Sequence, residues 1–252
     1  METSSILSRM LLVVEYMTIC VLWLIVSGSS SKLGQYYMPG EQCGYIIDSG
    51  DQFKVNSVGN DREEGHRSYP ANVSCTITFR TKPDKKFFML VTKFGIENSR
   101  DCQKDGLFLY NGHAAISENM IRSASRNGLC GEPLSLPNYF SSEANEVAVK
   151  FVTDATDNDY RGFQLVLTPY WQSDGQTKNC SSSEFTCVKS DKCITIDAKC
   201  NNVYNCADGT DEPETCPKSG RATSLQLDRL LHSLVYFVGA ISLVSAFRSV
   251  SA

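Results

Sequence analysis

The stretch VAVKFVTDATDNDYRGFQLVLT, residues 147–168, decides the fold, because apolar residues recur at every second position at both of its ends. In residues 147–151 and again in residues 163–168, the apolar side chains alternate with polar or smaller ones. Successive side chains of a strand point to opposite faces, so this spacing indicates strands with one buried face. The sequence therefore predicts two β-strands here.

The rest of this half of the chain has the same character. Residues 76–80, 87–93 and 106–110 resemble strands, and turn residues separate them at Lys82-Pro83-Asp84, Asn111-Gly112 and Asn127-Gly128. No long stretch has helical periodicity. Several short strands at this spacing predict an all-β fold in which two antiparallel sheets form a β-sandwich around one core.

Eleven cysteines in 252 residues suit an oxidising compartment far better than a reducing cytosol. The apolar run Tyr16–Val26 is followed by the small residues Ser27–Ser31, which is typical of a cleaved signal peptide over residues 1–31. An uncleaved anchor is the alternative. Cleavage would remove Cys20 and leave ten cysteines, an even number that can pair completely.

The ten cysteines fall into two groups, which predict two domains. Four are widely spaced through the strand-rich part, and six crowd into residues 180–216. We expect a first domain over residues 43–170, a short polar linker over 171–179 and a small second domain over 180–216. Pairing Cys43 with Cys75 and Cys102 with Cys130 would close two loops in the first domain, each worth about 3 kcal/mol on the chain-entropy model.

Four motifs of the first domain resemble a CUB domain in their order and spacing. They are SYPANVSCTITF (68–79), FGIENSRDCQKDGLFLYNG (94–112), LCGE (129–132) and FVTDATDNDYRGFQLVL (151–167). The resemblance implies a jelly-roll-like β-sandwich and the same cysteine pairing, first with second and third with fourth.

The same resemblance implies a calcium site at one end of the sandwich. Glu97, Asp105 and Asp154 occupy the positions of the family's carboxylate ligands, and three carboxylates from separate loops suit the oxygen-rich, flexible coordination of calcium. Tyr69 matches the family's tyrosine, which we expect to orient the glutamate without touching the ion. Asp157 is expected to assist directly or through water.

The second domain resembles the low-density lipoprotein receptor class A module over its whole length, ending in CNNVYNCADGTDE (200–212) and Cys216. So short a segment cannot bury enough apolar surface to fold unaided, so disulfides and a metal are expected to supply much of its stability. Spacing alone permits fifteen pairings of six cysteines. The family's pairing implies Cys180–Cys193, Cys187–Cys206 and Cys200–Cys216.

The resemblance also implies a calcium site in this module. Carried over by position, its ligands are the side chains of Asn201, Asn205, Asp211 and Glu212 and the backbone carbonyls of Ala198 and Val203. Two family carboxylates are amides here, so the ligand charge falls by two and we expect a weaker site. Capture of a ligand's lysine, as in lipoprotein recognition, is not expected. The module would act as a spacer or bind through Tyr204 and the surrounding surface.

The C-terminal part predicts membrane attachment. A polar spacer over residues 217–229 precedes the apolar run LLHSLVYFVGAISLVSAF over 230–247. Small residues, a polar spacer and an apolar tail favour a glycosylphosphatidylinositol (GPI) anchor, a single-pass helix is the second reading and a soluble amphipathic tail the third. Asn72 and Asn179 head glycosylation sequons on the expected extracellular side.

The residue inventory gives little support to catalysis. It lacks the hydrolase and metalloprotease motifs, the cysteine spacing does not follow zinc knuckles, and the net charge of −4 argues against nucleic acid. We therefore expect a non-catalytic, calcium-dependent binding protein at the cell surface. Its CUB domain would recognise an extracellular or membrane protein through a basic side chain at the calcium site.

The order of the domains resembles, in shortened form, auxiliary subunits that cluster or tune receptors. An endocytic or cargo receptor and a shed component of the extracellular matrix are the alternatives.

Overall fold

The computed structural model describes residues 33–48, 50–58, 68–124, 127–134, 138–173 and 179–216. The expected signal peptide (1–31), polar spacer (217–229) and apolar segment (230–247) lie outside these ranges. Within the described ranges, no helix is both long enough and apolar enough to cross a bilayer. The described residues up to Pro213 belong to one compact unit.

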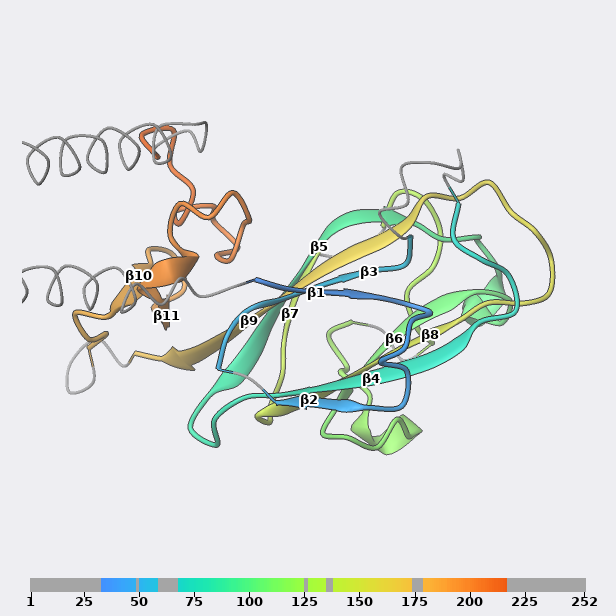
Figure 1. Ribbon diagram of the computed structural model, residues 1–252, viewed down its shortest axis with the longest axis horizontal. Coiled ribbons are helices and arrows are strands. Elements are labelled where there is room, and N and C mark those ends of the chain that lie inside the picture. Colours follow the sequence, from blue (N-terminus) through green and yellow to red (C-terminus); the bar gives the residue numbers. More distant parts are fainter. Residues whose placement is uncertain are drawn as a thin grey trace, which may run out of the picture. The chain divides into compact units, whose positions relative to one another are not determined.

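Two β-sheets face each other in the first domain (Figure 1). The first sheet has the order β2 (Ile46–Asp48), β4 (Ser74–Arg80), β8 (Glu146–Val152) and β6 (Gly106–Asn111). The second sheet contains β1 (Gly34–Tyr37), β3 (Phe53–Asn56), β9 (Gly162–Gln172), β5 (Lys86–Gly95) and β7 (Tyr139–Ser141). The helical elements of the described chain are the 3-10 turns Arg100–Cys102, Ser117–Asn119 and Ile196–Ala198. The predicted all-β sandwich is confirmed.

All five predicted strands are present, as β4, β5, β6, β8 and β9, whereas β1, β2, β3 and β7 were not predicted. The sandwich is not purely antiparallel, because β1 pairs with β3 and β2 pairs with β4 in parallel. Since β2 lies in the opposite sheet, the chain crosses between the sheets before it returns to form β3. The strand β1 precedes Cys43, where the first domain was expected to begin.

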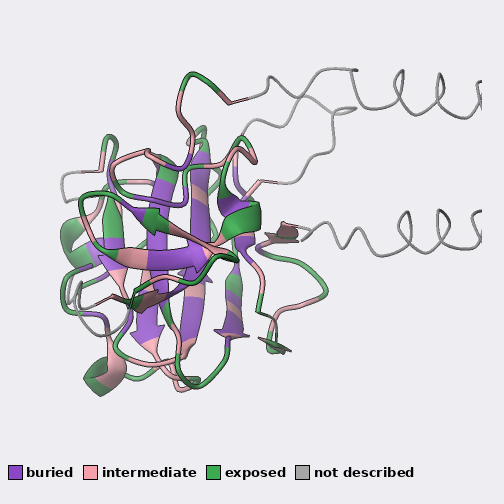
Figure 2. Cartoon of the chain, turned by 90° about the vertical axis from the view of Figure 1, so that its left-hand side faces the viewer, coloured by how far each residue is buried: buried purple, intermediate pink, exposed green. Residues whose placement is uncertain are grey.

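The core lies between the sheets and is built by the alternating residues that predicted the strands. Val149, Phe151 and Leu165 are completely buried, and they contact the buried Ile77 and Phe79 of β4 in one apolar cluster. Figure 2 shows the buried residues following the strands. Each such side chain contributes about 1.5–3 kcal/mol to folding relative to an exposed one.

The strand β5 differs from the predicted pattern, because its residues Phe87–Val91 are buried on both faces. Phe87 and Met89 belong to the core between the sheets, while Phe88 and Leu90 belong to a second apolar cluster with residues of the cysteine-rich module. That second cluster consists of Phe88, Leu90, Tyr170, Cys187, Ile194, Ala198 and Cys206. The module therefore covers the outer face of this sheet.

The expected linker is partly a strand. The strand β9 continues to Gln172, and its last two residues pair with the module's hairpin of β10 (Glu184–Cys187) and β11 (Lys192–Thr195). In the register, Trp171 lies opposite Cys193 and Gln172 opposite Lys192. The two domains thus share a continuous sheet, and β9 extends two residues into the expected linker.

The structure contains the disulfides Cys43–Cys75, Cys102–Cys130, Cys180–Cys193 and Cys187–Cys206. These are the pairs expected from the sequence. Cys200 and Cys216 are also disulfide-bonded.

Candidate metal centre

Three acidic residues meet at one end of the sandwich because of where the strands end. Asp105 directly precedes β6, and Asp154 follows β8 by two residues. Since β6 and β8 are paired neighbours with Gly106 opposite Val152, these two carboxylates leave the sheet side by side. Glu97 comes from the second sheet, just after β5, so two sheets and three loops contribute to the site.

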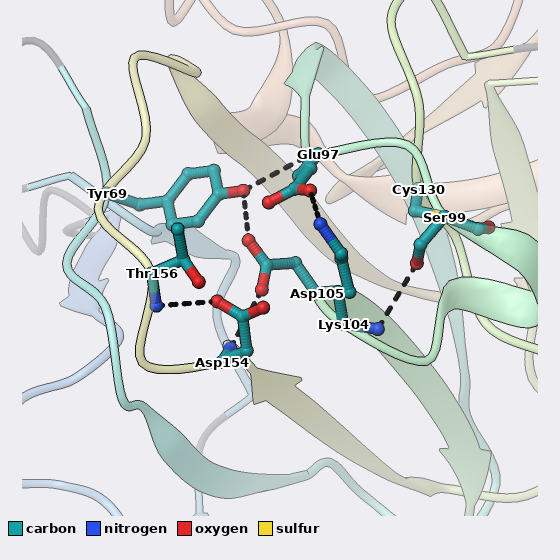
Figure 3. A network of polar contacts seen from close by, with 8 residues as sticks. All are labelled: Tyr69, Glu97, Ser99, Lys104, Asp105, Cys130, Asp154 and Thr156. Atoms are coloured by element: carbon teal, nitrogen blue, oxygen red, sulfur yellow. Dashed lines mark hydrogen bonds and ion pairs between the residues drawn. The ribbon is translucent and has the colours of Figure 1, made fainter.

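The carboxylates of Glu97, Asp105 and Asp154 each have an oxygen within 4.8 Å of the others. Asp105 is completely buried, and the other two are partly exposed. The backbone amide of Asp154 donates to Asp105 Oδ1 at 2.8 Å, and the amide of Thr156 donates to Asp154 Oδ1 at 2.8 Å. Figure 3 shows the three side chains converging. Without compensation, such a cluster repels itself.

Tyr69 anchors the buried side of the cluster in a way that the sequence did not predict. Its hydroxyl donates to Asp105 Oδ2 at 2.5 Å and accepts from the backbone amide of Glu97 at 2.9 Å (Figure 3). It was expected to orient the glutamate; it contacts Glu97 through the backbone amide and also holds the Asp105 side chain. Burial and the hydrogen bond to Asp105 raise the pKa of Tyr69, so its hydroxyl stays protonated and donates.

Lys104 completes the cluster, and sequence reasoning missed it. Its ammonium lies 2.5 Å from Glu97 Oε1, and the Glu97 carboxylate raises the pKa of Lys104 (Figure 3). The backbone amide of Lys104 donates to Ser99 Oγ at 3.2 Å. The sequence could have indicated this contact, because Lys104 directly precedes the expected ligand Asp105. Three carboxylates and one ammonium leave the cluster with a net charge of −2.

The donor set fits a calcium ion in charge and in kind. Within the described residues, Glu97 Oε2 and Asp154 Oδ2 accept no hydrogen bond, so each can coordinate a cation. Hard oxygen ligands from loops that can adjust are what calcium requires. Asp157 is exposed, and its carboxylate is not part of this cluster, so its assisting role remains a prediction.

The residues expected to hold calcium in the module also lie close together. One atom of the Asn205 side-chain amide lies 2.8 Å from the carbonyl of Val203, 3.2 Å from that of Ala198 and 3.3 Å from Asn201 Oδ1. The two remaining ligands contact backbone amides instead. Asp211 accepts from the amides of Asn205 (2.6 Å) and Cys206 (3.1 Å), and Glu212 accepts from that of Asn202 (2.9 Å).

Several other expected positions are at the surface. The sequon residues Asn72 and Asn179 are both exposed, and the Asn72 amide donates to the Asp154 carbonyl at 2.5 Å. Tyr204, the alternative contact residue of the module, is 55% exposed.

Asp211 is fully enclosed in the module, and this burial raises the pKa of its carboxyl.

Comparison with protein families matches both parts of the chain. The model of the CUB domain matches residues 56–167, and that of the low-density lipoprotein receptor domain class A matches residues 178–216. This chain carries a CUB domain followed by a class A module. Both are modules of protein–protein interaction.

Curated proteins with these domains are similar over different lengths. Neuropilin and tolloid-like protein 2 of Mus musculus is 25% identical over 224 residues, which are 86% of this chain and 38% of that protein. Procollagen C-endopeptidase enhancer 1 of Homo sapiens is 33% identical over 86 residues, 34% of this chain and 18% of that protein. The chain thus spans much less than two thirds of these relatives.

Among solved structures, the CUB1-EGF-CUB2 domains of rat MASP-1 are similar at 14% identity with a TM-score of 0.40. The match covers 59% of this chain and 51% of that one.

Proposed function

We propose that this chain is a non-catalytic, calcium-dependent binding protein of the cell surface, whose CUB domain recognises a basic side chain of a protein partner. The observation that carries this proposal is the cluster of Glu97, Asp105 and Asp154 at an end of the sandwich. The calcium ion would stabilise the loops that carry these carboxylates. Glu97, Asp105 and Asp154 would hold the ion, and Tyr69 would position Asp105.

The ion pair between Lys104 and Glu97 supports the second half of the proposal. It brings an ammonium to within 2.5 Å of a carboxylate of the cluster, on its solvent side. A lysine or arginine from a partner can pair with Glu97 in the same way after displacing Lys104. Loops that are already ordered lower the entropic cost of such binding.

The role of the whole protein is inferred from its domain order. CUB and class A modules precede an apolar segment over residues 230–247, for which we propose a GPI anchor, with a single-pass helix as the alternative. Because this domain order resembles that of auxiliary subunits in shortened form, we propose a role as an auxiliary or clustering subunit of a membrane receptor. The class A module would hold the CUB domain at a fixed distance from the membrane.

The first test of recognition uses a small basic probe. The full chain is titrated with Nα-acetyl-lysine amide while resonances around Glu97 and Asp154 are followed by NMR, with Nα-acetyl-norleucine amide as the matched neutral probe. We expect saturable shifts at these loops with the lysine probe in calcium and no such shifts in EGTA. Equal shifts with both probes, or shifts that persist in EGTA, would contradict the proposal.

A further inference from the structure

The expected calcium ligands of the class A module are occupied by contacts within the protein. Asn205 is completely buried, and one end of its amide faces the carbonyls of Val203 and Ala198 and the Oδ1 atom of Asn201. These three neighbours are oxygens, and the fourth, at 3.1 Å, is Asn201 Nδ2. A hydrogen-bond donor at this position therefore satisfies more of its neighbours than an acceptor does, unless a cation lies between them.

The amide nitrogen satisfies this position by itself. With Nδ2 directed to these oxygens, it donates to the Val203 carbonyl at 2.8 Å and to the Ala198 carbonyl at 3.2 Å. The other end of the amide, Oδ1, then accepts from the hydroxyl of Thr168 at 2.9 Å. Both ends are thereby hydrogen-bonded without an ion.

The acidic part of the site is hydrogen-bonded to the backbone of the module. Asp211 is completely enclosed, and its two carboxylate oxygens accept the backbone amides of Asn205 and Cys206. Glu212 accepts the backbone amide of Asn202. Among the expected ligands only Asp211 and Glu212 carry a negative charge. A site with so little charge is expected to bind calcium weakly.

The two amides of the module also contact the CUB domain. Asn201 Nδ2 donates to Gln52 Oε1 at 2.7 Å, and Asn205 contacts Thr168. Gln52 and Thr168 both belong to the CUB domain and are buried.

Apolar contacts at the same joint join the small core of the module to the CUB domain. Ile194 and Ala198 of the module are completely buried against Phe88 and Tyr170 of the CUB domain. The Lys192 ammonium also lies 5.0 Å from the centroid of the Tyr170 ring, within the range of a cation–π contact.

We propose that this class A module keeps its fold without calcium, because the Asn205 amide takes the place of the ion and the CUB domain supplies the missing apolar and polar contacts. The expected calcium ligands of the module, Asn201, Asn205, Asp211, Glu212, Ala198 and Val203, are then structural residues. The CUB domain and the module form one rigid body whose joint does not respond to calcium. This inference stands independently of the proposed recognition function.

Calcium stoichiometry of the full chain provides the first test. Isothermal titration of the native chain should show at most one ion per chain, and the double variant Glu97→Gln/Asp154→Asn should bind none. A second ion in the native chain, or one ion retained in the double variant, would overturn the inference. A native chain that binds no calcium would contradict the proposed function and leave the inference supported.

Hydrogen exchange tests the joint directly. The amides of Asn205 and Cys206 should stay equally protected in calcium and in EGTA, and Thr168→Val should speed their exchange about fivefold, the effect of one lost hydrogen bond. The matched control is Thr92→Val, whose hydroxyl bonds to Gln164 on the CUB sheet. Loss of protection in EGTA, or a Thr168→Val variant that exchanges like the control, would show that calcium and not the joint holds the module.

Discussion

The acidic residues of the CUB site differ in burial, and their partners differ accordingly. Asp105 is completely enclosed, so its carboxylate is held by the Tyr69 hydroxyl and the Asp154 amide. Glu97 lies closer to solvent and pairs with the mobile side chain of Lys104. A fixed buried ligand and an adjustable outer one let the same cluster hold an ion and meet a partner.

Lys104 should weaken the calcium site, since its positive charge competes with the ion for Glu97. We expect Lys104→Gln to raise calcium affinity about 3- to 10-fold at low salt, with the gain shrinking as ionic strength increases. Isothermal titration at two salt concentrations measures this change.

Lys86→Gln is the matched control, because Lys86 begins β5 at the end of the strand opposite to Glu97. It removes the same charge far from the site. An unchanged or reduced affinity in Lys104→Gln would show that the ion pair does not compete with calcium.

The sequence located this site well but not its full composition. Glu97, Asp105 and Asp154 could be named because motif positions fix where strands end, and the structure brings all three together. Lys104 was missed because the family's motif gives the positions of the expected calcium ligands. It does not show that a neighbouring lysine pairs with one of them.

At the scale of elements, an ion pair joins the neighbouring strands β4 and β8. The guanidinium of Arg80 lies 2.5 Å from Glu146 Oε1, and its other arm lies 3.2 Å from Asp48. The hydrogen bond from Arg80 lowers the pKa of Glu146 below its ordinary value. Both partners are accessible to solvent, so the contribution to stability is modest.

This lowered pKa has a defined consequence for the pH dependence of unfolding. Stabilisation by Glu146 is complete above the ordinary glutamate pKa, about 4.3, and is lost as the pH falls through the lowered value of the folded protein. The difference in unfolding free energy between the native chain and Glu146→Gln should therefore be largest near neutrality and shrink in acid. Urea titrations at several pH values measure it.

The exposed Glu143, in the turn before β8, provides the control. Its substitution by glutamine should have an effect that is small at every pH. A Glu146→Gln variant whose deficit grows in acid would contradict the assignment.

Sequence patterns predicted strands where one face is buried and missed elements of other kinds. The strands β1, β2 and β7 have only three or four residues, too few for a period of two to be visible. The run Phe87–Val91 could have been recognised as a strand buried on both faces, because it has five consecutive apolar residues. That run, together with β9 continuing past Tyr170, marks the docking of the module.

At the scale of the whole molecule, the proposed attachment can be measured on cells. The full chain is expressed at the cell surface and treated with phosphatidylinositol-specific phospholipase C. We expect release of the CUB domain into the medium, because the apolar segment 230–247 would be exchanged for a lipid anchor. Retention of the protein, with an epitope placed after Phe247 still present, would identify a spanning helix instead.

The long strand β9 sets a distance as well as a connection. It starts at Gly162, opposite Gly95 at the acidic end of the sandwich, and finishes at Gln172 against the module. At about 3.3 Å per residue, β9 is roughly 35 Å long. Because side chains alternate between faces, an insertion or deletion of a single residue before Tyr170 would turn its ring to the wrong side. A regular strand that keeps Tyr170 facing the module therefore changes its length in steps of two residues, about 7 Å at a time.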